Sequence, residues 1–175
     1  KKMIPPEKFG VKLMSMAFFQ ENEDEAIIWR GPMIHNAINQ MLQSTDWGDL
    51  DYLIVDLPPG TSDAPLTIMQ VLTMDGFIVV TTPQELAKID AKRSINMVRK
   101  LQVNVLGVVE NMSGGVFGEG AGKEIADELD LDFLGAIGLR SEYQDTSKPT
   151  SLLSNDVLNE YRTVSEKALA VLASN

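Results

Sequence analysis

The sequence predicts a doubly wound α/β domain with a mainly parallel sheet, and two features carry that prediction. Apolar runs of strand length alternate with stretches of helical periodicity along most of the chain. The apolar run 52–55 suits a strand buried on both faces of a parallel sheet, and it ends at Asp56 before a Pro-Pro-Gly turn. Because ligands bind beyond the carboxyl ends of strands in open α/β sheets, function is expected next to Asp56.

In chain order, the elements follow a βαβ rhythm. Strands are predicted near 11–17, 52–56, 76–81, 104–110 and 132–137, where the apolar runs have strand length. The first helix is predicted from residues at helical spacing before Trp47 and Gly48, namely Met33, Ile34, Ala37, Ile38, Met41 and Leu42. Further helices are predicted over 64–72, 85–101, 122–129 and 157–173. The polar segment 139–155 is predicted to be a surface connection, and a single domain is expected over 1–175.

Composition narrows the classes of partner. The 175 residues are 44% hydrophobic and 23% charged, which is ordinary for one globular core. A formal net charge of −10 argues against a sequence-independent binder of nucleic acid or of an anionic membrane, since either needs a basic surface. No apolar stretch reaches the roughly 18 residues of a membrane span. We therefore expect neither a nucleic-acid nor a membrane partner, and a cytoplasmic location.

A long motif surrounds Asp56. Residues 51–63, Asp-Tyr-Leu-Ile-Val-Asp-Leu-Pro-Pro-Gly-Thr-Ser-Asp, resemble the Walker B and switch II segment of Mrp-type (ApbC-type) P-loop ATPases, which are iron–sulfur cluster carriers. Segments that agree with the same family in order and spacing are 29–33, 80–84 and 106–113. Together they cover most of the chain from Gly10 to about Leu139. The resemblance implies a P-loop NTPase-like fold of the deviant Walker A, MinD-like class.

The resemblance also implies a function. It predicts an ATP-binding and ATP-hydrolysing carrier that uses ATP or ADP and Mg²⁺, works as a homodimer, and assembles and transfers a [4Fe–4S] cluster to apo iron–sulfur proteins. Hydrolysis is expected to be slow and regulatory. An alternative from another class is a MinD/ParA-like, ATP-switched dimeric positioning or partner-binding protein without a cluster. A third is an interaction module that has lost its nucleotide.

Candidate site residues follow from the same motifs. Asp56 is predicted to organise Mg²⁺ through a water, although a strand-terminal Asp also suits a cap of the strand–loop junction. The cofactor-binding turn is expected at Pro59, Gly60 and Thr61, where the Gly60 N–H can approach an anion closely. Asp63 is a candidate catalytic group linked to phosphate or water, or a helix N-cap, or both.

The second half of the chain contributes a candidate for base recognition. The Asn111 carboxamide offers a donor and an acceptor that match the N6 and N7 edge of adenine, and an Asx turn is the alternative role. Relatives usually carry proline at the position of Gly138, in a loop that can border the base. Arg30 suits a phosphate contact, a subunit contact or a buried ion pair equally. His35 and the nine methionines are assigned no chemical role.

Two departures from the family pattern concern its main sites. No Gly-rich phosphate loop with its Lys and Ser or Thr occurs, so we expect this sequence to be the C-terminal portion of the domain, with two parallel strand edges left unpaired. The sequence has no cysteine, whereas relatives carry a Cys-x-x-Cys insert after the segment equivalent to 111–113. Either the cluster site has been lost or a loop is omitted after Ser113, and we expect omission because the flanking segments persist.

Overall fold

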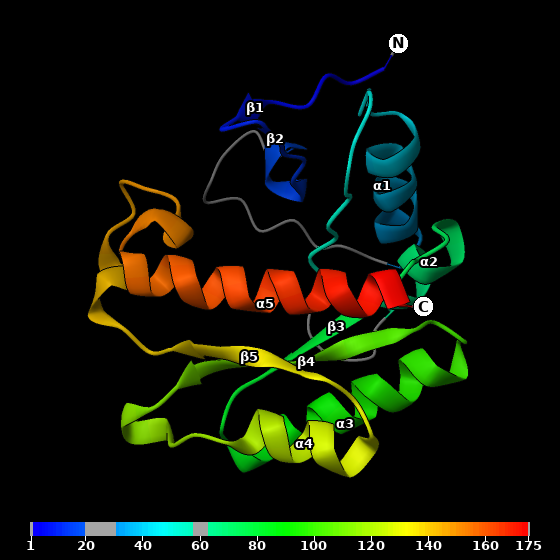
Figure 1. Ribbon diagram of the computed structural model, residues 1–175. Helices are drawn as coiled ribbons and strands as arrows, with labels where there is room; N and C mark the ends of the chain where they lie inside the picture. The colour runs from blue at the N-terminus through cyan, green and yellow to red at the C-terminus, as the bar shows by residue number, and fades with distance from the viewer. Residues whose placement is uncertain (1, 20–30, 58–62, 175) are drawn as a thin grey trace. The chain divides into compact units, whose positions relative to one another are not determined.

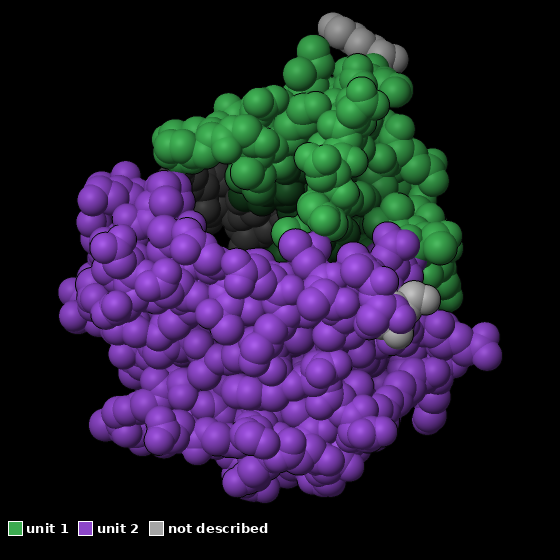
Figure 2. Space-filling model, in the orientation of Figure 1, with its two compact units in different colours: residues 1–73 green, residues 74–175 purple. Residues whose placement is uncertain are grey.

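The computed structural model describes residues 2–19, 31–57 and 63–174. The chain divides into two compact units, residues 1–73 and 74–175, which Figure 2 colours separately. Each unit is described on its own below. The first carries Asp56 and the start of the helix at Asp63, and the second carries Asn111.

Unit 1 contains a small hairpin and two helices. Strands β1 (Glu7–Lys8) and β2 (Val11–Lys12) pair antiparallel. The turn between them uses positive φ angles of 57° at Phe9 and 75° at Gly10, and glycine adopts that region without steric cost. A 3₁₀ turn, η1 (Met16–Phe19), follows, and then come helices α1 (Gly31–Gln43) and α2 (Asp63–Val71). Both predicted helices of this unit are confirmed.

Two strand predictions in unit 1 are wrong. Residues 52–57 form no strand, and the Tyr52, Leu53 and Ile54 side chains are exposed, Ile54 to 90%. A strand exists only where a neighbouring strand pairs with its backbone, and no described segment pairs with this one. The predicted strand 11–17 is reduced to Val11–Lys12, because the one partner it has among the described residues is the equally short β1.

Unit 2 is a parallel α/β layer structure. Its strands are β3 (Phe77–Thr81), β4 (Val105–Ser113) and β5 (Phe133–Gly138), and they pair in parallel in the order β3-β4-β5. Its helices are α3 (Glu85–Lys100), α4 (Ala121–Leu129) and α5 (Asn155–Ser174). Short 3₁₀ turns η2 (Gly115–Phe117), η3 (Ser141–Gln144) and η4 (Thr150–Leu152) complete it. The predicted elements of this half are confirmed, and so is the parallel α/β fold class.

The sheet of unit 2 is covered on both faces. Figure 1 shows α5 along one face and α3 with α4 along the other. Every residue from Val105 to Glu110 is buried, as expected of a central strand in a parallel sheet. The core beneath α5 consists of Val109, Leu134, Ile137 and Ala168. On the opposite helices, Ile95 of α3 and Ile125 of α4 are completely buried. Packing of these apolar side chains fixes the strand ends on which the site residues lie.

Strand β3 forms an incompletely covered edge. Within the described residues it pairs only with β4. Its Val80 lies opposite Val109 in register and is 59% exposed, and Ile78, two residues earlier on the same face, is 40% exposed. One of the unpaired parallel edges expected from the sequence is therefore present at β3.

Candidate functional site

The carboxyl ends of the three parallel strands meet at one edge of unit 2. Thr81 of β3 lies opposite Glu110 of β4, and Asn111 and Ser113 lie opposite Ile137 and Gly138 of β5. The backbone N–H of Leu139 donates to the Ser113 carbonyl at 2.9 Å and ties the ends of β4 and β5 together. This edge is where ligands bind in open α/β sheets.

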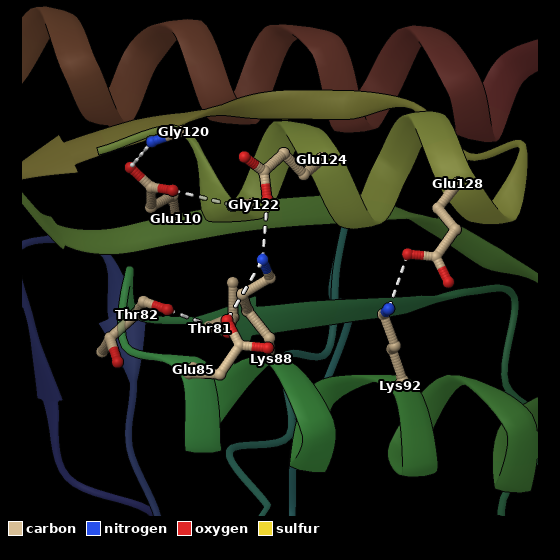
Figure 3. A network of polar contacts seen from close by, with 10 residues as sticks. All are labelled: Thr81, Thr82, Glu85, Lys88, Lys92, Glu110, Gly120, Gly122, Glu124 and Glu128. Atoms are coloured by element: carbon tan, nitrogen blue, oxygen red, sulfur yellow. Dashed lines mark hydrogen bonds and ion pairs between the residues drawn. The ribbon is translucent and has the colours of Figure 1, made fainter. Parts of the chain in front are cut away.

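Glu110 is the most buried polar side chain at this edge. It is 1% exposed, and its carboxylate accepts three hydrogen bonds. Oε1 accepts from the Ser113 hydroxyl at 2.7 Å and from the Gly120 N–H at 3.0 Å, while Oε2 accepts from the Gly122 N–H at 2.7 Å. Figure 3 shows the carboxylate directed at these two glycines. A buried carboxylate is tolerated only with such partners, so Glu110 is bound firmly to the loop that follows it.

The electrostatics agree with an ionised Glu110. Burial by itself raises the pKa of this carboxyl, but the hydrogen bonds from Gly122, Ser113 and Gly120 outweigh that effect and the pKa is lowered. The donors from Gly120 and Gly122 lie at the N-terminus of α4, whose N-cap Gly120 has no side chain to cap the helix. A carboxylate from β4 thus replaces the missing cap, and the positive end of the helix dipole favours its charge.

Strand β4 ends in a bulge. The pairing of β4 with β5 shifts between Asn111 and Ser113, and the intervening Met112 has a φ of 56°. The left-handed region costs a non-glycine residue about 1 to 2 kcal/mol, and bulges of this kind redirect side chains next to functional sites. The Met112 N–H donates to Asn111 Oδ1 at 2.9 Å. The bulge also turns the Ser113 hydroxyl back toward Glu110.

The loop after the bulge is short and closed upon itself. The Gly114 N–H donates to the Gly118 carbonyl at 2.7 Å, and the Phe117 N–H donates to the Gly114 carbonyl at 3.3 Å. Val116 at its tip is 92% exposed. We call residues 113–120 the β4–α4 loop. It includes the place, after Ser113, where a missing insert is expected from the sequence.

Ion pairs join the two helices on the same face of the sheet. Lys88 Nζ of α3 lies 2.6 Å from Glu124 Oε2 of α4, and Lys92 Nζ lies 2.5 Å from Glu128 Oε2 one turn later (Figure 3). The hydrogen bond that Lys88 donates to Glu124, with a further contribution from Glu85, raises the pKa of Lys88. These pairs hold α4 beside α3 but do not touch the Glu110 carboxylate.

The predicted site residues are distributed between the units. Asn111 lies at the carboxyl edge of unit 2, half-buried. Asp56 lies in unit 1 on an exposed segment after residues 52–55, and Asp63 is the first residue of α2. Pro59, Gly60 and Thr61 lie outside the described residues, as does Arg30. The assigned roles of all these residues stay predictions.

Sequence reasoning missed Glu110. The residue lies within the motif 106–113, and the motif by itself predicts no role for it. The available signal was a single carboxylate directly after the apolar run 105–109, which the structure shows to be fully buried. A charged residue on a strand buried on both faces is rare unless hydrogen bonds or an opposite charge compensate it. Such a residue therefore indicates a specific polar contact in the interior.

Unit 2 also has a hollow at the other end of its sheet. A shallow pocket of about 320 Å³ is lined in part by Asn104, Val105 and Asp132, at the amino ends of β4 and β5. This is the opposite end of the sheet from Asn111, and position at the carboxyl edge is the better guide to a ligand site in this fold. Among the described residues, no group of three or more His, Cys, Asp or Glu side chains is placed to hold a metal ion.

Comparison with known proteins decides the family. Residues 1–172 match the family model for ParA proteins described as NUBPL iron-transfer P-loop NTPases. The chain belongs to this family. The resemblance to Mrp-type P-loop ATPases is thereby confirmed. A solved nucleotide-binding protein from Archaeoglobus fulgidus, in complex with ADP, is 30% identical with a TM-score of 0.65, and the match covers 99% of this chain and 64% of that one.

Curated relatives of this NUBPL-type NTPase carry consistent names. The iron–sulfur cluster transfer protein NUBPL of Dictyostelium discoideum is 40% identical over 97% of the chain and 57% of its own length. An iron–sulfur cluster carrier protein of Deinococcus radiodurans is 42% identical over 99% of the chain and 51% of its own length. The chain therefore spans little more than half of these relatives. The septum site-determining protein MinD of Pyrococcus horikoshii, at 16% identity and a TM-score of 0.62, shares the fold.

Proposed function

We propose that this chain is part of an ATP-dependent iron–sulfur cluster carrier that delivers its cluster to apo iron–sulfur proteins. The observation that carries the proposal is the match to the iron-transfer family over residues 1–172, together with relatives named as cluster carriers at about 40% identity. We further propose that both units belong to one P-loop ATPase domain. Its location in the cytoplasm stays a prediction.

The described residues suit a nucleotide with Mg²⁺. Asn111 Oδ1 accepts one hydrogen bond, from the Met112 N–H. The Asn111 side-chain nitrogen donates no hydrogen bond within the described part of the chain. The carboxamide can therefore still donate to a base edge and accept from one. Asp56 is exposed and forms no ion pair with the other described residues. Its carboxylate is therefore accessible to a hydrated Mg²⁺ ion. Bound Mg²⁺ would neutralise charge on the phosphates during hydrolysis.

The proposed cargo needs ligands that these 175 residues lack. Thiolates hold iron–sulfur clusters, and the sequence contains no cysteine. We propose that an additional loop after Ser113 supplies one cysteine pair in the full-length protein. Two thiolates leave a four-iron cluster half ligated, so a second copy must supply the other pair across a two-fold axis. Homodimerisation follows from that ligand requirement.

Anaerobic reconstitution of the full-length protein tests the proposal. Thiol titration should first detect cysteine, and iron with sulfide should then yield about one [4Fe–4S] cluster per dimer and none on the monomer. Incubation of the same protein with iron alone serves as the control. A full-length protein without cysteine that stays colourless after reconstitution would contradict the carrier function. The ATP-switched partner-binding alternative would then describe the same residues better.

A further inference from the structure

The starting observation is that one carboxylate holds both ends of the β4–α4 loop. Glu110 Oε1 accepts hydrogen bonds from Ser113, the first residue of the loop, and from Gly120, the last. Oε2 accepts from Gly122 inside α4. The two loop ends are seven positions apart in sequence, yet both donate to the same oxygen atom. The separation of the two loop ends at the carboxyl edge of the sheet is therefore fixed by Glu110.

We propose that Glu110 is a positioning residue whose ionised carboxylate fixes the β4–α4 loop, and with it whatever that loop presents to the cargo. The cargo part rests on the proposed function, whereas the fixed loop does not. Glu110 acts through the loop and touches neither the nucleotide nor the cluster. The proposal gives a role to the buried Glu110 carboxylate, which takes no part in the proposed binding of nucleotide and Mg²⁺.

The pattern of donors requires a carboxylate and not merely a side chain of that shape. The groups that face the Glu110 carboxylate all donate: the Ser113 hydroxyl and the backbone N–H groups of Gly120 and Gly122, with a smaller contribution from the Ala121 N–H. A glutamine has one acceptor oxygen and a nitrogen that only donates. Whichever way its amide is turned, the nitrogen faces at least one backbone N–H. Substitution by glutamine therefore breaks at least one of the two backbone contacts, to Gly120 at the end of the loop or to Gly122 in the first turn of α4, while leaving side-chain volume nearly unchanged.

Local packing leaves the carboxylate little freedom to move. A Cβ added to Gly122 would lie 2.8 Å from Glu110 Cβ and 3.1 Å from Phe133 Cε2, so the N-terminus of α4 sits directly against β4 and β5. Real Cβ atoms essentially never approach another atom as closely as 2.8 Å, so the contact with Glu110 requires glycine at position 122. The start of α4 and the end of β4 cannot separate without breaking this contact at Gly122. The loop between them is therefore held at both ends.

The test uses the full-length protein with the substitution Glu110→Gln. The matched control is Glu128→Gln, the same chemical change on the exposed face of α4, where the carboxylate pairs with Lys92. A milder variant, Ser113→Ala, removes one donor to Glu110 and leaves both backbone donors in place. Ser113→Ala keeps the experiment decisive even where Glu110→Gln reduces the yield of folded protein.

Hydrogen exchange is the first measurement. In Glu110→Gln, the amide of Gly120, that of Gly122 or both should exchange roughly tenfold faster or more, because at least one hydrogen bond to a charged acceptor is lost. The amide of Leu131, which donates to Ala126 at the other end of α4, should keep its wild-type rate and so exclude general unfolding. Glu128→Gln should change none of these rates.

Cluster retention is the second measurement. After reconstitution with iron and sulfide, Glu110→Gln should lose iron to a chelator roughly tenfold faster than wild type at unchanged ATP affinity. A double-mutant cycle with Ser113→Ala should be non-additive, because both substitutions disrupt the same contact. Unchanged exchange at Gly120 and Gly122 would overturn the inference, and so would a uniform rise in exchange together with lost ATP affinity. If wild type takes up no cluster, the proposed function fails while the exchange result still decides the role of Glu110.

Discussion

At the scale of single residues, burial determines how much a charged side chain contributes to stability. Glu110 is 1% exposed and satisfied by three donors, while Lys92 and Glu128 form an exposed pair between helices. Hydrogen bonds to a charged group contribute about 1.5 to 3 kcal/mol, whereas exposed ion pairs contribute about 0 to 1 kcal/mol. Losing a donor at Glu110 should therefore matter more than losing the Lys92 pair.

Asp56→Ala in the full-length protein should abolish Mg²⁺-dependent ATP hydrolysis and leave unfolding cooperative. The substitution removes a proposed metal organiser from an exposed position and deletes no core volume. Phosphate release measured with and without Mg²⁺ checks the first part, and thermal unfolding checks the second. Asp51→Ala, which removes an exposed carboxylate from the same segment, is the control. ATP turnover at the wild-type rate in Asp56→Ala would exclude a Walker B role.

Asn111→Ala should weaken adenine nucleotides more than it weakens pyrophosphate. Only the base loses a partner, at a cost of about 1 to 3 kcal/mol. Calorimetric titration of full-length protein with ADP and with pyrophosphate gives both affinities. Because Asn111 also accepts from the Met112 N–H, an equal loss for both ligands would mean that its role is to support the bulge.

At the scale of elements, the end of β4 and the start of α4 form one structural piece. The strand ends in a bulge at Met112, the helix begins at a glycine with no capping side chain, and Glu110 joins them. Each feature alone is unfavourable: a left-handed methionine, an uncapped helix and a buried charge. Together they satisfy one another, because the bulge delivers the Ser113 hydroxyl and the helix delivers its free N–H groups.

This junction should be sensitive to acid. The folded-state pKa of Glu110 is lowered, so its stabilising contribution is complete above the unfolded-state value of about 4.3 and is lost as pH falls through the folded-state pKa. The difference in free energy of unfolding between wild type and Glu110→Gln should be constant near neutral pH and shrink below about pH 4.3. Denaturant titrations at a series of pH values measure it. A difference that grows on acidification would mean that Glu110 is protonated in the folded state.

At the scale of the whole molecule, apolar side chains stay exposed in both units. In unit 2 these include Ile78 and Val80 on the edge strand β3, and in unit 1 they include Leu53 and Ile54. Strand-forming sequences of this kind are normally paired or covered. None of the described helices combines enough length with enough apolar character to cross a bilayer. With a net charge of −10, the surface remains strongly acidic in spite of these apolar positions.

The sequence predicted local structure well wherever a single chain segment decides it. Helix α3 was expected over 85–101 and runs Glu85–Lys100, and α4 was expected over 122–129 and runs Ala121–Leu129. Helical hydrogen bonds lie within the segment, so periodicity is a sufficient guide. The strand expected at 52–56 was wrong because its hydrogen bonds must come from another segment, which no pattern within these five residues can supply.

By itself, then, the sequence determined the parallel α/β class, most elements of unit 2 and the family, because periodicity and ordered motifs are properties of the chain alone. It also marked Asn111 at the end of a strand. Only the tertiary structure decided which segments pair and what Glu110 does. Its three donors come from positions 113, 120 and 122, and they converge on one carboxylate only after a bulge and a helix N-terminus have been packed against β4. Local sequence patterns do not predict such a contact, because it depends on the distances between these groups in the folded chain.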